Sequence, residues 1–201
     1  MSKKVYLFDF DGTITSADTL LRFIRFACGT WRFLLGFILH SPMIIAMKLN
    51  LCDNGMTKQK VFSWFFRGMS IDVFDNLCQR FATENFNLMR PKATDLLNRL
   101  FRDNEDIVIV SASLVNWVSP FFTHIQRDSK SNFHVLGTMP EVKDGIITGR
   151  FLTYNCYGAE KVHCIRRLYP DRENYHFIAF GDSNGDKQML AFADESYYRI
   201  F

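Results

Sequence analysis

The 201-residue sequence has no long block of lysine or arginine, although its 24 basic residues outnumber its 21 acidic ones. Basic arms that bind nucleic acid usually concentrate their charge in such blocks. Here the formal net charge of +3 is spread along the chain. The charge therefore suits an anionic ligand, and we expect no nucleic-acid partner.

Cysteine is scarce, and its spacing is unlike that of a disulfide scaffold or a zinc site. The five cysteines are an odd number and form no Cys-x-x-Cys pair. Small secreted proteins that depend on disulfides usually carry an even number of cysteines. We therefore expect reduced thiols and a cytoplasmic protein.

The sequence also lacks an uninterrupted apolar run of the length that a membrane span requires, about 18 residues or more. The most hydrophobic segment, residues 31–51, is interrupted by polar or helix-breaking residues, namely Arg32, His40, Pro42 and Lys48. We expect two short helices here, separated at Ser41 and Pro42. Near the N-terminus a short apolar run reaches an aspartate too soon for a signal peptide.

That N-terminal run ends at two carboxylates. Residues 5–8 suit a buried strand, and Asp9, Phe10 and Asp11 follow before the turn residues Gly12 and Thr13. Alternation along an extended chain places Asp9 and Asp11 on the same side. Two like charges so close are unfavourable unless a cation or a shared proton relieves the repulsion. The pattern therefore indicates a bound metal ion.

Apolar patterning divides the rest of the chain into two regions. Residues 15–89 show helical spacing throughout. From residue 90, helices alternate with strands expected at 107–110, 133–136, 177–180 and 197–201, and Asp144-Gly145 predicts a hairpin. This alternation favours a parallel α/β sheet, whose ligands gather at the carboxyl ends of the strands. We expect residues 1–14 and 90–201 to form this core domain and residues 15–89 to form an inserted helical domain.

Four separated motifs carry polar residues at or near these strand ends. They are Asp9-x-Asp11-Gly-Thr, Ser111 after an apolar strand, Lys161 at a helix start, and Gly181-Asp182-x-x-x-Asp186. Their order and residue types resemble the haloacid dehalogenase-like phosphatase superfamily over nearly the whole chain. The helical insertion after the first motif resembles the branch that includes phosphoserine phosphatase. The resemblance implies a Rossmann-like parallel core with an inserted, all-helical cap of the C1 type.

The same resemblance implies a phosphomonoester hydrolase that forms an aspartyl-phosphate. Asp9 is expected to attack phosphorus, while Asp11 protonates the leaving alcohol and then activates water. Ser111 is expected to hydrogen-bond a phosphoryl oxygen. Lys161 is expected to neutralise the charge that Asp9 and the phosphate share.

The expected cofactor is Mg²⁺, a hard cation that prefers oxygen ligands. The resemblance assigns its ligands to Asp9, the backbone carbonyl of Asp11, and Asp182. Asp186, with Gly181 in the same motif, is expected to support the metal site from outside the ligand set by orienting waters or Lys161.

Substrate specificity is expected to come from the cap, residues 15–89. Asp18 lies nine residues after Asp9, the offset at which phosphoserine phosphatases carry a Glu that binds the substrate amine. This favours a small phosphorylated metabolite that bears an amine or several hydroxyls. Lys58, Lys60 and Arg67 are candidates for binding a substrate carboxylate. The other expected substrate contacts are Thr13, Ala112 and Ser113; the run Ser111-Ala112-Ser113 replaces the Ser-Gly-Gly of phosphoserine phosphatases.

Two alternatives stay open. Residues 31–51 resemble the hydrophobic cap of bacterial phosphatidylglycerophosphate phosphatases, and Arg22, Arg25, Arg32 and Lys48 flank or interrupt the segment. Such a lid could lie at a membrane surface and admit a lipid phosphate. The other alternative is a non-catalytic module that binds Mg²⁺ and phosphate, against which the intact Asp9 and Asp11 argue. The sequence does not reveal the oligomeric state.

Overall fold

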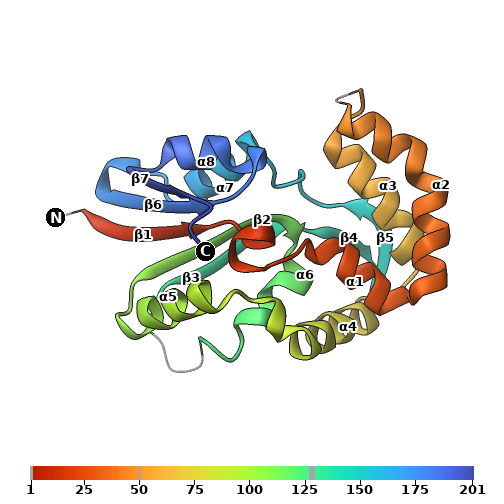
Figure 1. The fold of residues 1–201 in the computed structure, drawn as a ribbon, viewed down its shortest axis with the longest axis horizontal. Helices are drawn as coiled ribbons and strands as arrows, with labels where there is room; N and C mark the ends of the chain where they lie inside the picture. Colours follow the sequence, from red (N-terminus) through yellow and green to blue (C-terminus); the bar gives the residue numbers. More distant parts are fainter. Residues whose placement is uncertain (1, 50, 127–129) are drawn as a thin grey trace.

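A computed structural model describes residues 2–49, 51–126 and 130–201, so Asn50 of the apolar segment lies outside the described residues. Among these residues, five parallel strands form one sheet in the order β3-β2-β1-β6-β7 (Figure 1). The strands are β1 (Lys3–Phe8), β2 (Asp106–Leu114), β3 (Phe133–Thr138), β6 (Tyr175–Gly181) and β7 (Glu195–Tyr198). This arrangement confirms the expected parallel α/β core.

Helices cover both faces of the sheet. Helices α7 (Ala159–Leu168) and α8 (Lys187–Phe192) lie on one face, and α5 (Pro91–Arg102) and α6 (Val115–Val118) lie on the other (Figure 1). Side chains alternate along β1, so Val5 and Leu7 pack with Ile165 of α7, whereas Phe8 joins the larger cluster on the opposite face. Both faces of the central strand are therefore buried, and its carboxyl end is held in a fixed place.

The inserted segment forms the expected helical cap. It contains α1 (Thr19–Cys28), α2 (Thr30–Lys48), α3 (Asn54–Phe66) and α4 (Ile71–Glu84). Its interior is aromatic: Phe23 stacks on Trp117 of α6 and packs edge-on against Phe74 and Phe81. Because Trp117 belongs to the sheet domain, this stacking joins the cap to the core through buried apolar surface.

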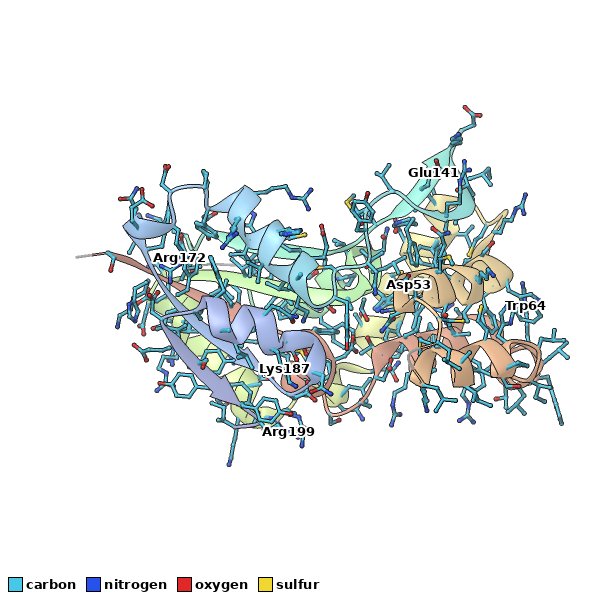
Figure 2. All side chains as sticks on the ribbon, turned by 90° about the horizontal axis from the view of Figure 1, so that it is seen from above. Asp53, Trp64, Glu141, Arg172, Lys187 and Arg199 are labelled. Carbon is cyan, nitrogen blue, oxygen red and sulfur yellow. The ribbon has the colours of Figure 1, made fainter. Side chains whose placement is uncertain are left out.

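A β-hairpin from the second half of the chain also packs against the cap. Strands β4 (Pro140–Lys143) and β5 (Ile146–Phe151) are joined at Asp144 and Gly145, whose φ angles of 49° and 75° suit a type I′ turn. Phe151 lies against Phe62 of α3. Figure 2 shows Glu141 of β4 on the same side of the molecule as Trp64 of α3, far from Arg172 beside the sheet. The predicted hairpin is present, and it packs against the cap.

The prediction of two short helices separated at Ser41 and Pro42 is wrong. Helix α2 runs without interruption from Thr30 to Lys48 and contains Pro42. Proline has no N–H to donate to the carbonyl four residues earlier, which belongs to Ile38. The Ser41 hydroxyl donates to that carbonyl instead, at 2.8 Å. A local side-chain hydrogen bond thus replaces the missing backbone bond, and the helix continues.

Other boundaries differ from the sequence prediction by a few residues. Strand β2 continues beyond Val110 as far as Leu114, with a shift of register against β3 between Ser111 and Leu114. The last strand ends at Tyr198, before the predicted limit of residue 201. Short helical turns complete the chain at Phe10–Ile14, Phe86–Leu88, Ser119–Phe122, Arg172–Asn174 and Asn184–Asp186.

Candidate active site

A cavity of about 560 Å³ lies between the sheet and the cap. Of the predicted motif residues, Asp9, Asp11, Lys161 and Asp186 line it, whereas Ser111 and Asp182 do not. Asp9 follows β1 and Ser113 lies near the end of β2, and both line this cavity from the sheet side. Its other walls come from the cap, through α1, α2 and α3. The apolar part of these walls consists of Leu20, Leu21, Phe37, Ile44, Met47 and Val61. The cavity is therefore charged on the side of the sheet and largely apolar on the side of the cap.

A buried lysine lies between two carboxylates on the charged side of the cavity. Lys161, near the start of α7, is 1% exposed. Its ammonium group donates to Asp9 Oδ1 at 2.5 Å, to Asp186 Oδ1 at 2.6 Å and to the carbonyl of Val110 at 2.8 Å. All three ammonium protons thus have acceptors. Such an arrangement compensates the cost of burying the charge.

The charges of this cluster shift one another's proton affinity. Burial raises the pKa of Asp9 to about 7, although the nearby Lys161 ammonium opposes the shift. Burial disfavours the charged form of Lys161, but the Asp9 and Asp186 carboxylates outweigh this effect and raise its pKa. Burial also raises the pKa of Asp182, and Asp186 adds to that shift. With three carboxylates around one lysine, the site favours an additional cation.

The donor set fits a magnesium ion. Asp9, Asp182 and Asp186 each offer a carboxylate oxygen, and these oxygens lie within 4.8 Å of one another. However, Asp186 is already engaged: its Oδ1 accepts from Lys161, and its Oδ2 accepts from the backbone and hydroxyl of Ser183. Asp9 is engaged as well, since its Oδ1 accepts from Lys161 and its Oδ2 lies 3.1 Å from the Thr13 hydroxyl. The ligand roles of Asp9 and Asp182 and the orienting role of Asp186 stay predictions. Oxygen donors of this type are those that Mg²⁺ prefers.

Glycines allow the carboxylates to approach the backbone closely. Gly12 has φ +88°, and a Cβ at this position would lie 2.8 Å from the carboxyl carbon of Asp182. A Cβ on Gly181 would lie 2.7 Å from the Cβ of Asp186. Thr13 is buried between the two carboxylates, and its hydroxyl lies 3.1 Å from Asp9 Oδ2 and 3.2 Å from Asp182 Oδ1. Gly12, Thr13 and Gly181 therefore shape the carboxylate cluster.

The side chain of Asp11 turns away from this cluster and toward the cap. Its Oδ1 accepts from the backbone N–H of Thr19 at 2.7 Å and from the Thr19 hydroxyl at 2.6 Å. Its Oδ2 accepts from the Ser113 hydroxyl at 2.5 Å. Asp9 and Asp11 therefore have different hydrogen-bond partners, and their different catalytic roles stay a prediction. Any part of Asp11 in metal binding is left to its backbone carbonyl.

Ser111 takes a position different from that of Ser113. Ser111 is 1% exposed and does not line the cavity, and its hydroxyl oxygen accepts from the backbone N–H of Ser113 at 3.0 Å. Ala112 and Ser113 do line the cavity. Contact between Ser111 and a phosphoryl group stays a prediction.

The expected cap residues fall into two groups. Asp18 lines the cavity, where it also caps α1 by accepting from the backbone N–H of Leu20 at 2.9 Å. Arg67 is exposed at the end of α3, beside Gly149 of β5, and does not line the cavity. The structure therefore does not bring Arg67 to the site.

Of the three basic candidates, Lys58, Lys60 and Arg67, Lys58 is the one that lines the cavity. Its ammonium group lines the cavity and donates to the carbonyl of Ala112 at 2.8 Å. Burial lowers the pKa of Lys58, although Asp11 and Asp18 oppose the shift. Lys58 and Val61 stand three residues apart on one face of α3, and both line the cavity.

Comparisons with known proteins show which sequences this chain resembles. The family model described as haloacid dehalogenase-like hydrolase matches residues 6–191. Among curated proteins, the chain is similar to Protein CicA from Caulobacter vibrioides. The two are 34% identical over 199 residues, which cover 96% of this chain and 85% of that protein.

Solved structures share the fold at low sequence identity. A protein of unknown function from Bordetella pertussis Tohama I superposes with a TM-score of 0.82 at 14% identity, covering 98% of this chain and 89% of that one. A substrate-bound phosphoserine phosphatase complex gives a TM-score of 0.63 at 17% identity, covering 98% and 86%. A phospho-aspartyl intermediate analogue of phosphoserine phosphatase gives 0.61 at 19% identity, with the same coverage. These likenesses concern the fold.

Proposed function

This chain belongs to the haloacid dehalogenase-like hydrolases, and on that premise we propose that it is a Mg²⁺-dependent phosphomonoester hydrolase acting through Asp9. One observation carries the proposal: buried Lys161 bridges Asp9 and Asp186, with Asp182 alongside, at the carboxyl ends of parallel strands. A carboxylate held beside a cation is suited to attack phosphorus. The substrate proposed first is a small phosphorylated metabolite, phosphoserine-like or related.

The residues supply a balanced two-step reaction. A bond forms between an Asp9 oxygen and phosphorus as the bond from phosphorus to the leaving alcohol breaks, and Asp11 gives the alcohol its proton. Asp11 then removes a proton from a water molecule that attacks phosphorus, and this releases inorganic phosphate and restores Asp9. Lys161 keeps Asp9 oriented and neutralises charge near the phosphoryl oxygens.

Mg²⁺, held by Asp9, Asp182 and the Asp11 backbone carbonyl, would stabilise negative charge on the phosphoryl group. Hydrogen bonds within the protein hold the groups around this position in place. Thr13 separates the two carboxylates, and Asp186 fixes the backbone that follows Asp182 through the N–H of Ser183 at 2.9 Å. Loss of the metal would leave the excess carboxylate charge uncompensated.

A screen of phosphomonoesters tests this proposal. We expect the purified protein to hydrolyse at least one member of a panel containing phosphoserine, phosphoethanolamine, histidinol phosphate and sugar phosphates. Because the carboxylate cluster requires a cation, EDTA should remove this activity and added Mg²⁺ should restore it. A protein that hydrolyses no phosphomonoester with Mg²⁺, but still binds phosphate, would instead be the non-catalytic module.

The exposed face of α2 favours a second candidate, a lipid phosphate phosphatase. Trp31, Leu35 and Ile38 are 85%, 53% and 69% exposed. By length and composition alone, α2 could cross a membrane; it is the one such helix in the described part of the chain, with a mean hydropathy of 1.3. Its other side is packed, however, since Phe37 contacts Phe65 of α3. An apolar helix fixed to a folded domain on one side suits a membrane surface better than a span.

The charge of this region and the cavity wall support the same candidate. Residues 19–52 contain no Asp or Glu but carry Arg22, Arg25, Arg32 and Lys48. Such a basic apolar segment is attracted to anionic lipid. Helix α2 also contributes Phe37, Ile44, Met47 and Lys48 to the cavity. An apolar substrate tail could therefore lie against the helix that meets the membrane.

Vesicle flotation tests the lipid candidate. We expect the protein to float with vesicles rich in phosphatidylglycerol. Leu35→Glu together with Ile38→Glu should weaken that binding at least about tenfold, since charge replaces the exposed apolar surface that would enter the lipid. Val73→Glu on α4 is the matched control, because Val73 and Leu35 are both 53% exposed. Wild-type protein that stays in solution with these vesicles and does not hydrolyse phosphatidylglycerophosphate would refute this candidate.

A further inference from the structure

Ser113 marks a departure from the related phosphatases at the second motif. This chain carries Ser111-Ala112-Ser113 where phosphoserine phosphatases carry Ser-Gly-Gly. The extra hydroxyl is not free, because it donates to Asp11 Oδ2 at 2.5 Å. A glycine at this position has no side chain that could make such a bond. The departure therefore adds a contact to the residue proposed to transfer protons.

The backbone around Ser113 is shaped to aim its hydroxyl at Asp11. Strand β2 shifts its register against β3 between Ser111 and Leu114, so that consecutive residues Ala112 and Ser113 both line the cavity. Irregularities of this kind redirect side chains near functional sites. A Cβ on the facing residue Gly137 would lie 2.8 Å from the Ser113 carbonyl oxygen. Glycine at 137 thus permits the close approach that the shift requires.

Neighbouring contacts hold this backbone in place. The Ser113 N–H donates to the Ser111 hydroxyl oxygen at 3.0 Å, and Lys58 of the cap donates to the Ala112 carbonyl at 2.8 Å. Ser113 itself is 2% exposed, so water does not compete freely for its hydroxyl. A hydrogen bond from a buried hydroxyl to a carboxylate is among the stronger kinds in proteins.

The opposite oxygen of Asp11 is held from the cap. Thr19, the first residue of α1, donates to Oδ1 through both its N–H and its hydroxyl. Ser113 on the core side and Thr19 on the cap side therefore fix both carboxylate oxygens. Without Ser113, Oδ2 has no other hydrogen-bond donor among the described residues, and the carboxyl group can rotate about its contact with Thr19.

We propose that Ser113 is a positioning residue that orients Asp11 for proton transfer to the leaving alcohol. This inference rests on the proposed phosphatase function. General acid catalysis matters most when the leaving group is a poor one, such as an alkoxide. A nitrophenolate leaves readily without a proton. Ser113 should therefore control the dependence of the rate on the leaving group.

The experiment compares two leaving groups in Ser113→Ala. The measured quantity is kcat/KM with Mg²⁺, because it reports the step in which the leaving group departs. For an alkyl phosphate from the active panel, Ser113→Ala should lower kcat/KM about tenfold or more. For p-nitrophenyl phosphate the loss should be less than about threefold. Ser113→Thr, which keeps the hydroxyl, should restore at least part of the alkyl phosphate activity relative to Ser113→Ala.

The outcomes separate this inference from the proposed function. If the wild-type protein hydrolyses both substrates and Ser113→Ala loses activity equally on both, or on neither, the positioning role is wrong and the phosphatase function stands. If the wild-type protein hydrolyses neither substrate, the proposed function fails, and the inference fails with it because Asp11 then transfers no proton.

Discussion

Replacing Asp9 by asparagine is expected to lower kcat for phosphomonoester hydrolysis at least about 10⁴-fold, because an amide cannot form the aspartyl-phosphate. Asparagine has nearly the same shape as aspartate, and Lys161 keeps its bonds to Asp186 and to the Val110 carbonyl. The folded structure should therefore survive. Steady-state kinetics on the most active substrate of the panel measure the effect.

Asp95→Asn is the matched control for this variant, since it removes an equal charge from an exposed position on α5. It should leave kcat within about twofold of wild type. Thermal unfolding of both variants shows whether they are folded. A folded Asp9→Asn protein that keeps more than a few per cent of wild-type turnover would show that another group is the nucleophile.

Replacing Lys161 by methionine is expected to have the largest effect on stability. The substitution leaves Asp9 and Asp186 buried without their shared cation, a change that typically costs about 3–5 kcal/mol of unfolding free energy. Turnover should also fall, because Asp9 loses its orienting partner. Urea unfolding in EDTA measures the loss of stability.

Added Mg²⁺ should return part of the stability of Lys161→Met, because the ion supplies positive charge near the same carboxylates. Lys92→Met, at an exposed position on α5, provides the control and should change stability by less than about 0.5 kcal/mol. Equal stability of Lys161→Met and Lys92→Met in EDTA would contradict the account of the charge cluster.

The sequence predicted the sheet, and it predicted that Asp9, Asp182 and Lys161 lie near one another, because both depend on local patterns. Apolar runs that stop at polar residues identify strand ends, and parallel strands bring these ends together. This logic is sufficient for Asp9 and Asp182. Lys161 was found through the order of the motifs, since a lysine alone resembles any surface charge.

Other features depend on contacts that no local pattern reveals. The bond between Ser113 and Asp11 requires the register shift of β2 and a glycine on the neighbouring strand. The choice of Lys58 over Arg67 depends on which side of α3 faces the cavity. Helix α2 continues through Pro42 with one side packed on α3, where Phe37 contacts Phe65.

The hairpin also combines a feature that residue type predicts with one that depends on long-range contacts. Asp144 and Gly145 predict a tight turn from residue type alone. Packing of β5 on α3, through Phe151 and Phe62, is a long-range contact between segments far apart in the sequence. Residue type therefore predicts the hairpin, and tertiary packing decides which domain the hairpin contacts.

The most direct test is to trap the phosphorylated enzyme. Wild-type protein is mixed with Mg²⁺ and its best substrate, quenched in acid during turnover, digested and analysed by mass spectrometry. One added phosphoryl group is expected on the peptide that contains Asp9, and none on that peptide in the Asp9→Asn protein. Rapid turnover with no phosphoryl group on that peptide, or with the group on another residue, would contradict this mechanism.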